Sequence, residues 1–372
     1  MKNNIPPELF IGIMSGTSLD GIDVCLVQFD PEFILLKSNT LPFSDSLQDK
    51  IKTLTHSGNN EIERMAAAEL ILTNEYATAV KTVLNQANIN AEKITAMGVH
   101  GQTIRHIPTT ENTPGYSLQL VDPSSLAVAS GIPVCSDFRR KDIALGGQGA
   151  PLVPAFHQYC FASPTQNRVI VNIGGIANIS TLPSDQSQQI GFDTGPGNTL
   201  LDNWFHKHQR GRFDNHGDWA RTGNTHNNLL SRLLSDPYFM RTAPKSTGPE
   251  YFNLNWLEKY LSENEPLSAE DIQATLTDLT AITIAQAIHA SAQTAEVFVC
   301  GGGTHNHFLI ERLETHLKTT TQNTECFGIH PDDVEAVAFA WLAKQRIQLL
   351  PGNLPSATGA SRTAILGSLT MP

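Results

Sequence analysis

The sequence predicts an α/β protein built from two domains of similar layout. Two apolar strands flank a glycine-containing turn at residues 10–29, and the same strand–turn–strand layout returns at residues 169–182. Short apolar runs elsewhere alternate with stretches of helical periodicity. With 372 residues, 40% of them hydrophobic, the chain is long enough to bury two cores. The repeated layout therefore indicates a duplicated α/β domain.

Composition excludes several classes of protein. Only 16% of the residues are charged, which is too few for a disordered or coiled-coil chain. The net charge of -11 and the lack of a basic run argue against a nucleic-acid partner. The five cysteines form no Cys-x-x-Cys pair, so we interpret them as thiols of a reducing compartment. No signal core and no run of about 18 apolar residues occurs, so we expect a cytoplasmic protein with no membrane partner.

The turn of the first hairpin, residues 15–21, is a candidate phosphate site. Apart from Leu19 its residues are small or polar, with two glycines, three hydroxyls and one aspartate. Such a loop can direct several backbone N–H groups and hydroxyls at one anion. No lysine follows the second glycine, so the loop is not of the Walker type. An ordinary glycine hairpin is the alternative interpretation.

A second candidate site follows the helix predicted over residues 61–86. A short apolar strand at 94–99 runs directly into a His-Gly-Gln-Thr turn at 100–103. Folds of the α/β class bind ligands at the carboxyl ends of their strands. The alternative role for His100 and Gln102 is to stabilise the turn by hydrogen bonds.

Charged residues follow the next predicted strand. Asp137, Arg139 and Arg140 stand there, and arginine commonly binds carboxylate or phosphate. Surface ion pairs are the alternative. The glycine-rich stretch at 146–151 then offers the best candidate for a crossing between domains.

The second hairpin leads to a candidate catalytic carboxylate. Asp193 is expected at the end of a short strand, just before a helix predicted over residues 198–209. A carboxylate beside a helix N-terminus is well placed for chemistry on an anionic ligand. The alternative is an aspartate that binds turn amides.

Residues 211–255 show little periodicity and are rich in Gly, Asn, Asp, His and Pro. Irregular chain of this length indicates a functional lid or a connection with short helices. Four histidines in and before this stretch lack a metal-ligand spacing. They are His206, His208, His216 and His226.

The last part of the chain predicts a long helix at 271–292, then a strand and a turn with three glycines at 301–303. Glycines after a strand let a flat or charged ligand approach the backbone, and a plain flexible turn is the alternative. A largely apolar, buried helix is expected over 335–348. Glu335 lies in its first turn, where the helix dipole favours a carboxylate, so simple capping would also explain it. The C-terminus is expected to return to the first domain.

Seven motifs occur in order along nearly the whole chain. They are Met-Ser-Gly-Thr-Ser-Leu-Asp-Gly (14–21), His-Gly-Gln-Thr (100–103), Asp-Phe-Arg (137–139), Gly-Gly-Gln-Gly-Ala-Pro (146–151), Asn-Ile-Gly-Gly-Ile-Ala-Asn (172–178), Gly-Phe-Asp-Thr-Gly-Pro-Gly-Asn (191–198) and Cys-Gly-Gly-Gly-Thr-His-Asn (300–306). Together they resemble the anhydro-N-acetylmuramic acid kinase family, the first and sixth being the most specific.

The resemblance implies two duplicated α/β domains of the actin-like ATPase (ribonuclease H-like) type, with the active site in the interdomain cleft. The first domain would comprise residues 1–140 and 350–372, and the second residues 150–345. The crossings between them would be residues 141–150 and 335–348.

The resemblance also implies a reaction. ATP, water and 1,6-anhydro-N-acetylmuramic acid would give N-acetylmuramic acid 6-phosphate and ADP, in peptidoglycan recycling and amino-sugar metabolism. Asp193 would be the catalytic base and Glu335 an assistant. Mg²⁺ would accompany ATP, with no metal ligands assigned, and the protein would be a homodimer.

Further site residues follow from the same motifs. Those expected to bind nucleotide are Ser15, Gly16, Thr17, Ser18, Leu19, Asp20, Gly21, Asp23, Gly174, Gly175, Gly301, Gly302, Gly303 and Asn306. Those expected to bind the sugar are His100, Gln102, Thr103, Arg139 and Asn178. Two alternatives remain: a kinase of the same superfamily with another acceptor, and a non-catalytic nucleotide switch that binds a protein.

Overall fold

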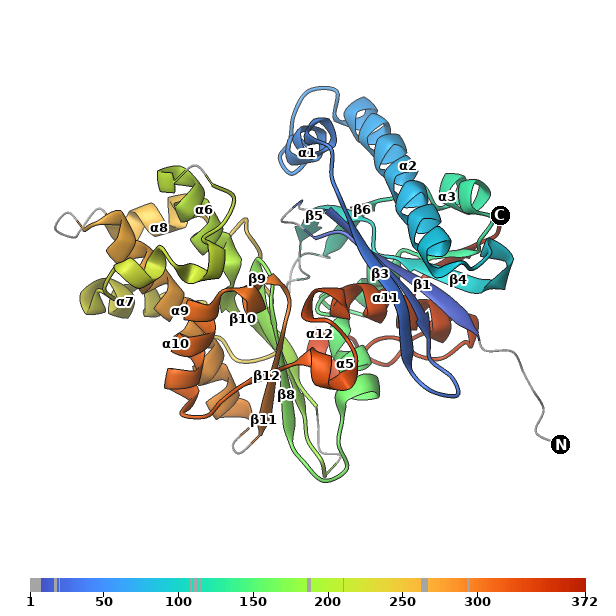
Figure 1. The fold of residues 1–372 in the computed structure, drawn as a ribbon. Coiled ribbons are helices and arrows are strands. Elements are labelled where there is room, and N and C mark those ends of the chain that lie inside the picture. The colour runs from blue at the N-terminus through green and yellow to red at the C-terminus, as the bar shows by residue number, and fades with distance from the viewer. Residues whose placement is uncertain are drawn as a thin grey trace. The chain divides into compact units, whose positions relative to one another are not determined.

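The computed structural model describes residues 8–372 apart from 17, 18, 20, 108, 110–112, 114, 186–188, 210, 262–266 and 293–294. The chain divides into two compact units (Figure 1). The first is Met1–Phe156 with Asp333–Pro372, and the second is His157–Asp332. Each unit has its own hydrophobic core.

A six-stranded sheet in the order β13-β7-β4-β1-β2-β3 forms the centre of the first unit. Strands β1 (Leu9–Met14) and β2 (Gly21–Gln28) make the predicted antiparallel hairpin. The other strands of the sheet are β3 (Ile34–Pro42), β4 (Ile94–Val99), β7 (Val134–Ser136) and β13 (Ser368–Thr370). Because β13 pairs with β7, the C-terminus returns to the first sheet, as expected.

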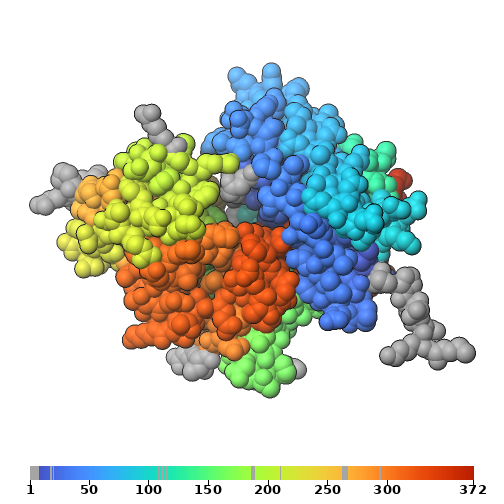
Figure 2. Space-filling model, viewed as in Figure 1, coloured from blue at the N-terminus to red at the C-terminus, as the bar shows by residue number. Residues whose placement is uncertain are grey.

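Helices of the first unit cover this sheet. Helix α2 packs its buried stripe into the core with the hairpin strands, and Figure 2 shows in blue the surface that α1, α2 and β3 form. The elements are α1 (Asp45–Lys52), α2 (Glu61–Ala87), α3 (Pro123–Ser130), α4 (Phe138–Ala144), α11 (Val334–Ile347), α12 (Pro355–Thr358) and a small hairpin of β5 (Gln102–Ile107) with β6 (Tyr116–Leu120).

Two glycines let helix α11 lie directly on the first sheet. Gly12 of β1 and Gly98 of β4 are register partners. A Cβ on Gly12 would come within 1.8 Å of the Ala336 carbonyl, and one on Gly98 within 1.9 Å of the Phe339 carbonyl. Because glycine has no side chain, the backbone of α11 can pack directly against the backbone of β1 and β4. The alanine-rich helix is buried, as predicted.

The second unit contains a five-stranded sheet in the order β10-β9-β8-β11-β12. Strands β8 (Arg168–Ile173) and β9 (Ile176–Leu182) form the second predicted hairpin. The remaining strands are β10 (Gly191–Pro196), β11 (Glu296–Cys300) and β12 (Gln322–Asn323). Its helices are α6 (Asn198–Gln209), α7 (Asn227–Leu234), α8 (Leu254–Leu261), α9 (Ala269–Ser291) and α10 (His307–Leu317). Helix α5 (Val153–Phe161) contains the point at which the chain passes into this unit.

The two sheets share one topology. In each, three consecutive antiparallel strands are followed by two strands that run parallel to the first, giving β3-β2-β1-β4-β7 and β10-β9-β8-β11-β12. A helix enters before the fourth strand and another before the fifth. The predicted duplication of an α/β domain is therefore confirmed.

The compact units differ in extent from the expected domains. The chain passes between units at 156/157 and 332/333, whereas the crossings were expected at 141–150 and 335–348. The second of these segments lies almost entirely in α11, which packs against Gly12 and Gly98 of the first sheet. A role for either segment as a hinge remains a prediction. No helix in the described part of the chain is long and apolar enough to cross a membrane.

Candidate active site

The loop of the first hairpin is anchored at two points. The buried Ser15 hydroxyl forms a 2.7 Å hydrogen bond with the hydroxyl of Tyr76 on α2. Leu19, with a φ of 59°, inserts into the core while its N–H donates to the Gly16 carbonyl at 3.2 Å. Gly21 begins β2. Three predicted nucleotide-binding residues, Thr17, Ser18 and Asp20, lie outside the described residues.

Asp23 is the described carboxylate of this hairpin. It lies in β2 and accepts a 2.7 Å hydrogen bond from Thr40 Oγ1 of β3. Among the residues that the structure describes, no group of three or more His, Cys, Asp or Glu could hold a metal. Mg²⁺ that arrives with substrate phosphates keeps several waters and needs only one or two protein carboxylates. A single carboxylate at this hairpin is compatible with such an ion.

His100 and Arg139 form a fixed pair in the first unit. Arg139 Nε and Nη2 lie 3.1 Å and 2.8 Å from His100 Nε2. The backbone N–H of His100 donates to the Ile13 carbonyl at 3.0 Å. A guanidinium can only donate, so Nε2 is the acceptor and the ring proton resides on Nδ1. Burial, followed by the Arg139 charge, holds the pKa of His100 well below its usual value. The imidazole is therefore neutral.

The residues after His100 do not form the simple turn that was expected. Only Gly101, with a φ of 76°, makes the turn, and Gln102 already begins β5. Gln102 Nε2 donates to the Gly16 carbonyl at 3.1 Å, while its buried Oε1 has no hydrogen-bond partner among the described residues. Thr103 Oγ1 accepts from Gln119 at 3.2 Å. The structure thus brings His100, Gln102 and Arg139 to the first hairpin.

Asp193 lies in the middle of β10, not at the strand end that was expected. Its side chain is buried, and the Thr247 N–H donates to Oδ2 at 3.0 Å. Its backbone N–H donates to the Lys245 carbonyl at 3.1 Å, and Tyr238 donates to its carbonyl at 2.8 Å. Asn178 is its register partner on β9. The structure therefore brings two predicted site residues, Asp193 and Asn178, side by side.

The amides at the N-terminus of helix α6 bind protein carbonyls. Amides of residues 197–199 donate to the carbonyls of Gly174 and Gly175 at 2.8–3.0 Å. A Cβ on Gly197 would come within 2.3 Å of the Gly174 carbonyl. These donors hold the turn of the second hairpin, because helix-end amides that pair with protein carbonyls are already satisfied. Chemistry of Asp193 on an anionic ligand stays a prediction.

The glycine turn after β11 combines a constrained and an open part. Gly301 has a φ of 80°, and a Cβ on Gly303 would come within 2.3 Å of the Ile173 side chain. Nothing lies within 4 Å of a Cβ placed on Gly302, so the backbone is accessible there. Asn306 caps helix α10 by accepting from the Leu309 N–H at 3.0 Å.

In the first unit, Glu335 is half-buried in the first turn of α11.

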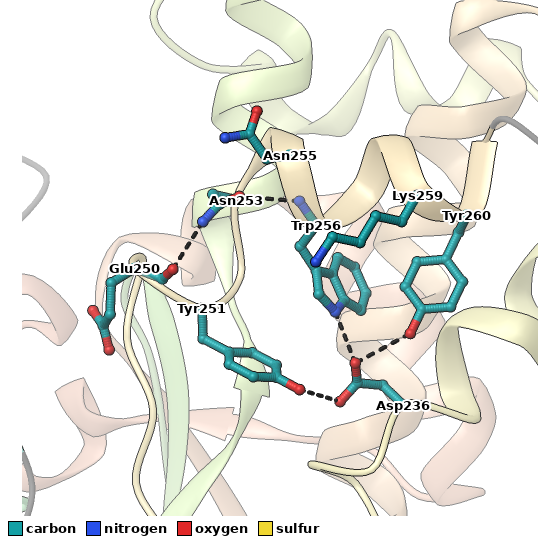
Figure 3. Close-up of a pocket in the computed structure, with 8 residues that line it drawn as sticks. All are labelled: Asp236, Glu250, Tyr251, Asn253, Asn255, Trp256, Lys259 and Tyr260. Atoms are coloured by element: carbon teal, nitrogen blue, oxygen red, sulfur yellow. Dashed lines mark hydrogen bonds between the residues drawn. The ribbon is translucent and has the colours of Figure 1, made fainter.

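No specific sequence pattern pointed to the residues that hold Asp193. Tyr238, Lys245 and Thr247 belong to residues 236–253, which we call the strap, within the stretch predicted as a lid or connection. A buried carboxylate, Asp236, anchors this strap. Figure 3 shows Tyr251, Trp256 and Tyr260 directed at it around a shallow pocket, and their distances to the carboxylate are 2.8, 2.8 and 3.1 Å.

Hydrogen bonding decides the ionisation of this anchor. Burial alone would raise the pKa of Asp236, but the hydrogen bonds donated by Trp256, Tyr238, Tyr251 and Tyr260 outweigh the effect of burial, and the pKa lies below its usual value.

Lys245, another residue of the strap, has its ammonium over the Tyr238 ring, 4.7 Å from the ring centroid. Burial, then Arg241, lower the pKa of Lys245, whereas the Asp193 charge raises it.

Comparison with known proteins agrees with these motifs. The family model described as anhydro-N-acetylmuramic acid kinase matches residues 8–372. A protein of that name from Shewanella pealeana (strain ATCC 700345 / ANG-SQ1) is 48% identical over 370 residues, covering 99% of each chain. One from Coxiella burnetii (strain Dugway 5J108-111) is 46% identical over 370 residues, covering 98% of each. The chain belongs to the anhydro-N-acetylmuramic acid kinase family.

Proposed function

We propose that the protein is an ATP-dependent kinase that opens 1,6-anhydro-N-acetylmuramic acid with water and phosphorylates its O6. The products are N-acetylmuramic acid 6-phosphate and ADP, formed in peptidoglycan recycling and amino-sugar metabolism. The observation that carries this proposal is the family match over nearly the whole chain, which includes the motif around the buried Asp193.

The chemistry requires one base rather than the usual pair of carboxylates. An inverting glycoside hydrolase needs a base to activate water and an acid to protonate the departing oxygen. In a 1,6-anhydro sugar the departing oxygen, O6, stays attached to the same sugar through C6, and it can accept the phosphoryl group of ATP in place of a proton. A single carboxylate beside the anomeric carbon therefore suffices.

We assign Asp193 as this base. Its burial and the Thr247 N–H bond to Oδ2 support the assignment, because they hold one carboxylate oxygen in a fixed direction. Glu335 is proposed as an assistant, on the strength of its place in the first turn of α11.

Nucleotide binding is proposed for the two hairpins and the glycine turn. The loop 15–21 with Asp23, the turn Gly174–Gly175 and the segment 301–306 would bind ATP. The open backbone at Gly302 supports this for the third segment. Mg²⁺ would neutralise phosphate charge during transfer. His100, Gln102, Thr103, Arg139 and Asn178 would bind the sugar. The buried Oε1 of Gln102, which has no hydrogen-bond partner in the part of the chain that the structure describes, supports that role. A homodimer remains a prediction from the resemblance, and a cytoplasmic location remains a prediction from the composition and the N-terminal sequence.

The decisive assay follows sugar-dependent ADP release from Mg-ATP together with formation of the sugar phosphate. ATP hydrolysis that no anhydro sugar stimulates would reject the kinase and favour a nucleotide switch. Turnover of other sugars with no preference for the anhydro sugar would favour another acceptor.

Asp193→Asn tests the base. We expect kcat to fall by at least about 100-fold because the amide cannot take a proton from water, while ATP binding is retained. Asp218→Asn, an exposed aspartate of the same unit, is the matched control and should keep kcat. Near-normal turnover by Asp193→Asn would reject the assignment.

A further inference from the structure

Another buried carboxylate, Asp142, lies close to the proposed sugar site. It is on helix α4 and has no measurable exposure. Oδ1 accepts from Asn353 Nδ2 and Thr358 Oγ1, both at 2.8 Å, and Oδ2 accepts from the Gly149 N–H at 2.9 Å. Within the described residues, no cation pairs with it. A buried carboxylate without a cation is costly unless hydrogen bonds satisfy both oxygens, and here they do.

Asp142 holds the loop at residues 146–150 in place. The Gly147 N–H donates to the Asp142 carbonyl at 3.0 Å. A Cβ on Gly147 would come within 2.2 Å of Oδ2, so only glycine lets the loop lie on the carboxylate. Gly149, with a φ of 71°, then turns its N–H to Oδ2.

The held loop in turn orients Arg139. The Gly149 carbonyl accepts from Arg139 Nη1 at 2.7 Å, while Nε and Nη2 of the same guanidinium donate to His100 Nε2. A planar guanidinium with acceptors on two sides can adopt only one orientation. One of those acceptors, the Gly149 carbonyl, belongs to the peptide segment that Asp142 fixes.

We infer that Asp142 is a positioning residue for sugar binding, which acts through Gly149 on the guanidinium of Arg139. This inference rests on the proposed role of Arg139 in sugar binding. Asp142 itself touches no substrate; it determines where the arginine donors point. The glycine-rich motif at 146–151 accordingly helps to orient a residue of the proposed sugar site, in addition to its expected role as a crossing between domains.

Asp142→Asn tests the inference. The amide can still accept from Asn353 and Thr358 through its oxygen, but its NH₂ then faces the Gly149 N–H, and two donors repel the loop. We expect the KM for the sugar to rise about tenfold, as for loss of one charged hydrogen bond, with the KM for ATP unchanged. Thr358→Val, which removes a donor from the other oxygen only, is the control and should leave the sugar KM unchanged.

A double-mutant cycle separates positioning from general damage. On an Arg139→Met background, Asp142→Asn should raise the sugar KM by less than about twofold, because the residue it acts through is gone. The same tenfold rise on both backgrounds would overturn the inference. Gly147→Ala, which pushes the loop off the carboxylate, should reproduce the effect and the non-additivity, and it serves if Asp142→Asn does not fold. An unchanged sugar KM in Arg139→Met alone would overturn both the arginine's proposed role and the inference.

Discussion

The two hairpins occupy equivalent places in their sheets but are held by different means. In the first, six residues separate β1 from β2, and the side chains of Ser15 and Leu19 anchor the loop from within. In the second, only Gly174 and Gly175 separate the strands, and amides of helix α6 bind their carbonyls. The same topology therefore supports a longer polar loop in one unit and a tight, externally held turn in the other.

The third strand differs even more between the units. Strand β3 is an edge strand with mostly exposed or half-buried residues, whereas all six residues of its counterpart β10 are buried. The second unit inserts α6, α7, the strap and α8 before its long helix α9, and the strap contacts Asp193 in β10. Duplication supplied two similar sheets, and the insertion in one of them created the buried environment of the proposed base.

The largest effect is expected from removing Asp236, the anchor of the strap. It tests whether the strap is what distinguishes β10 from β3 by holding Asp193. Asp236→Ala leaves the side chains of Tyr251, Trp256 and Tyr260 without their acceptor. We expect the second unit to lose about 3 kcal/mol of stability, and kcat to fall because Asp193 is held less firmly. Urea unfolding and steady-state kinetics measure the two effects.

Asn255→Ala is the control for the strap anchor, since Asn255 is exposed beside the same pocket. It should change stability by less than about 0.5 kcal/mol. A normal kcat in a destabilised Asp236→Ala protein would show that the strap is not needed to hold Asp193.

An intermediate effect is expected on the pH dependence of the stability of the second unit. Burial lowers the pKa of His157, at the start of the second unit, to about 3, whereas the unfolded value is about 6.5. The folded state thus favours the neutral ring. Its stabilising contribution is complete above about pH 6.5 and is lost as the pH falls toward 3, about 2 kcal/mol of it by pH 5.

The measurement is urea unfolding by tryptophan fluorescence between pH 7 and 5. Three of the four tryptophans, Trp204, Trp219 and Trp256, lie in the second unit and report mainly on it. His157→Gln should lower the slope by about 1.4 kcal/mol per pH unit. An unchanged slope would show that the burial of His157 is not the source of the acid sensitivity.

The smallest effect tests how the first hairpin is anchored. Ser15→Ala and Tyr76→Phe each remove the same buried hydrogen bond, so each should cost about 1 kcal/mol. If the hydroxyl of Ser15 only anchors the loop, both variants should retain the KM for ATP, as measured by initial rates. A raised KM in Ser15→Ala alone would show that this hydroxyl also binds nucleotide.

Much of the fold was predictable because it depends on local periodicity. The hairpin strands, α2, α6, α9 and α11 lie within a few residues of the predicted ranges, since their apolar spacing and glycines are local features. The position of Asp193 within β10 was not predictable, because pairing with β9 extends the strand through Gly195 and Pro196. Strand ends depend on partners that a local pattern does not contain.

The sequence by itself determined the duplicated α/β class, the family and the motifs from which the site was proposed. Tertiary structure decided which groups those motifs meet: Tyr76 for Ser15, Gly149 and His100 for Arg139, and the strap for Asp193. It also decided that amides at the start of α6 bind the carbonyls of the Gly174–Gly175 turn. The physical reason is that a hydrogen-bonding group is used by the partner that folding brings within about 3 Å, and the distance along the chain does not reveal that partner.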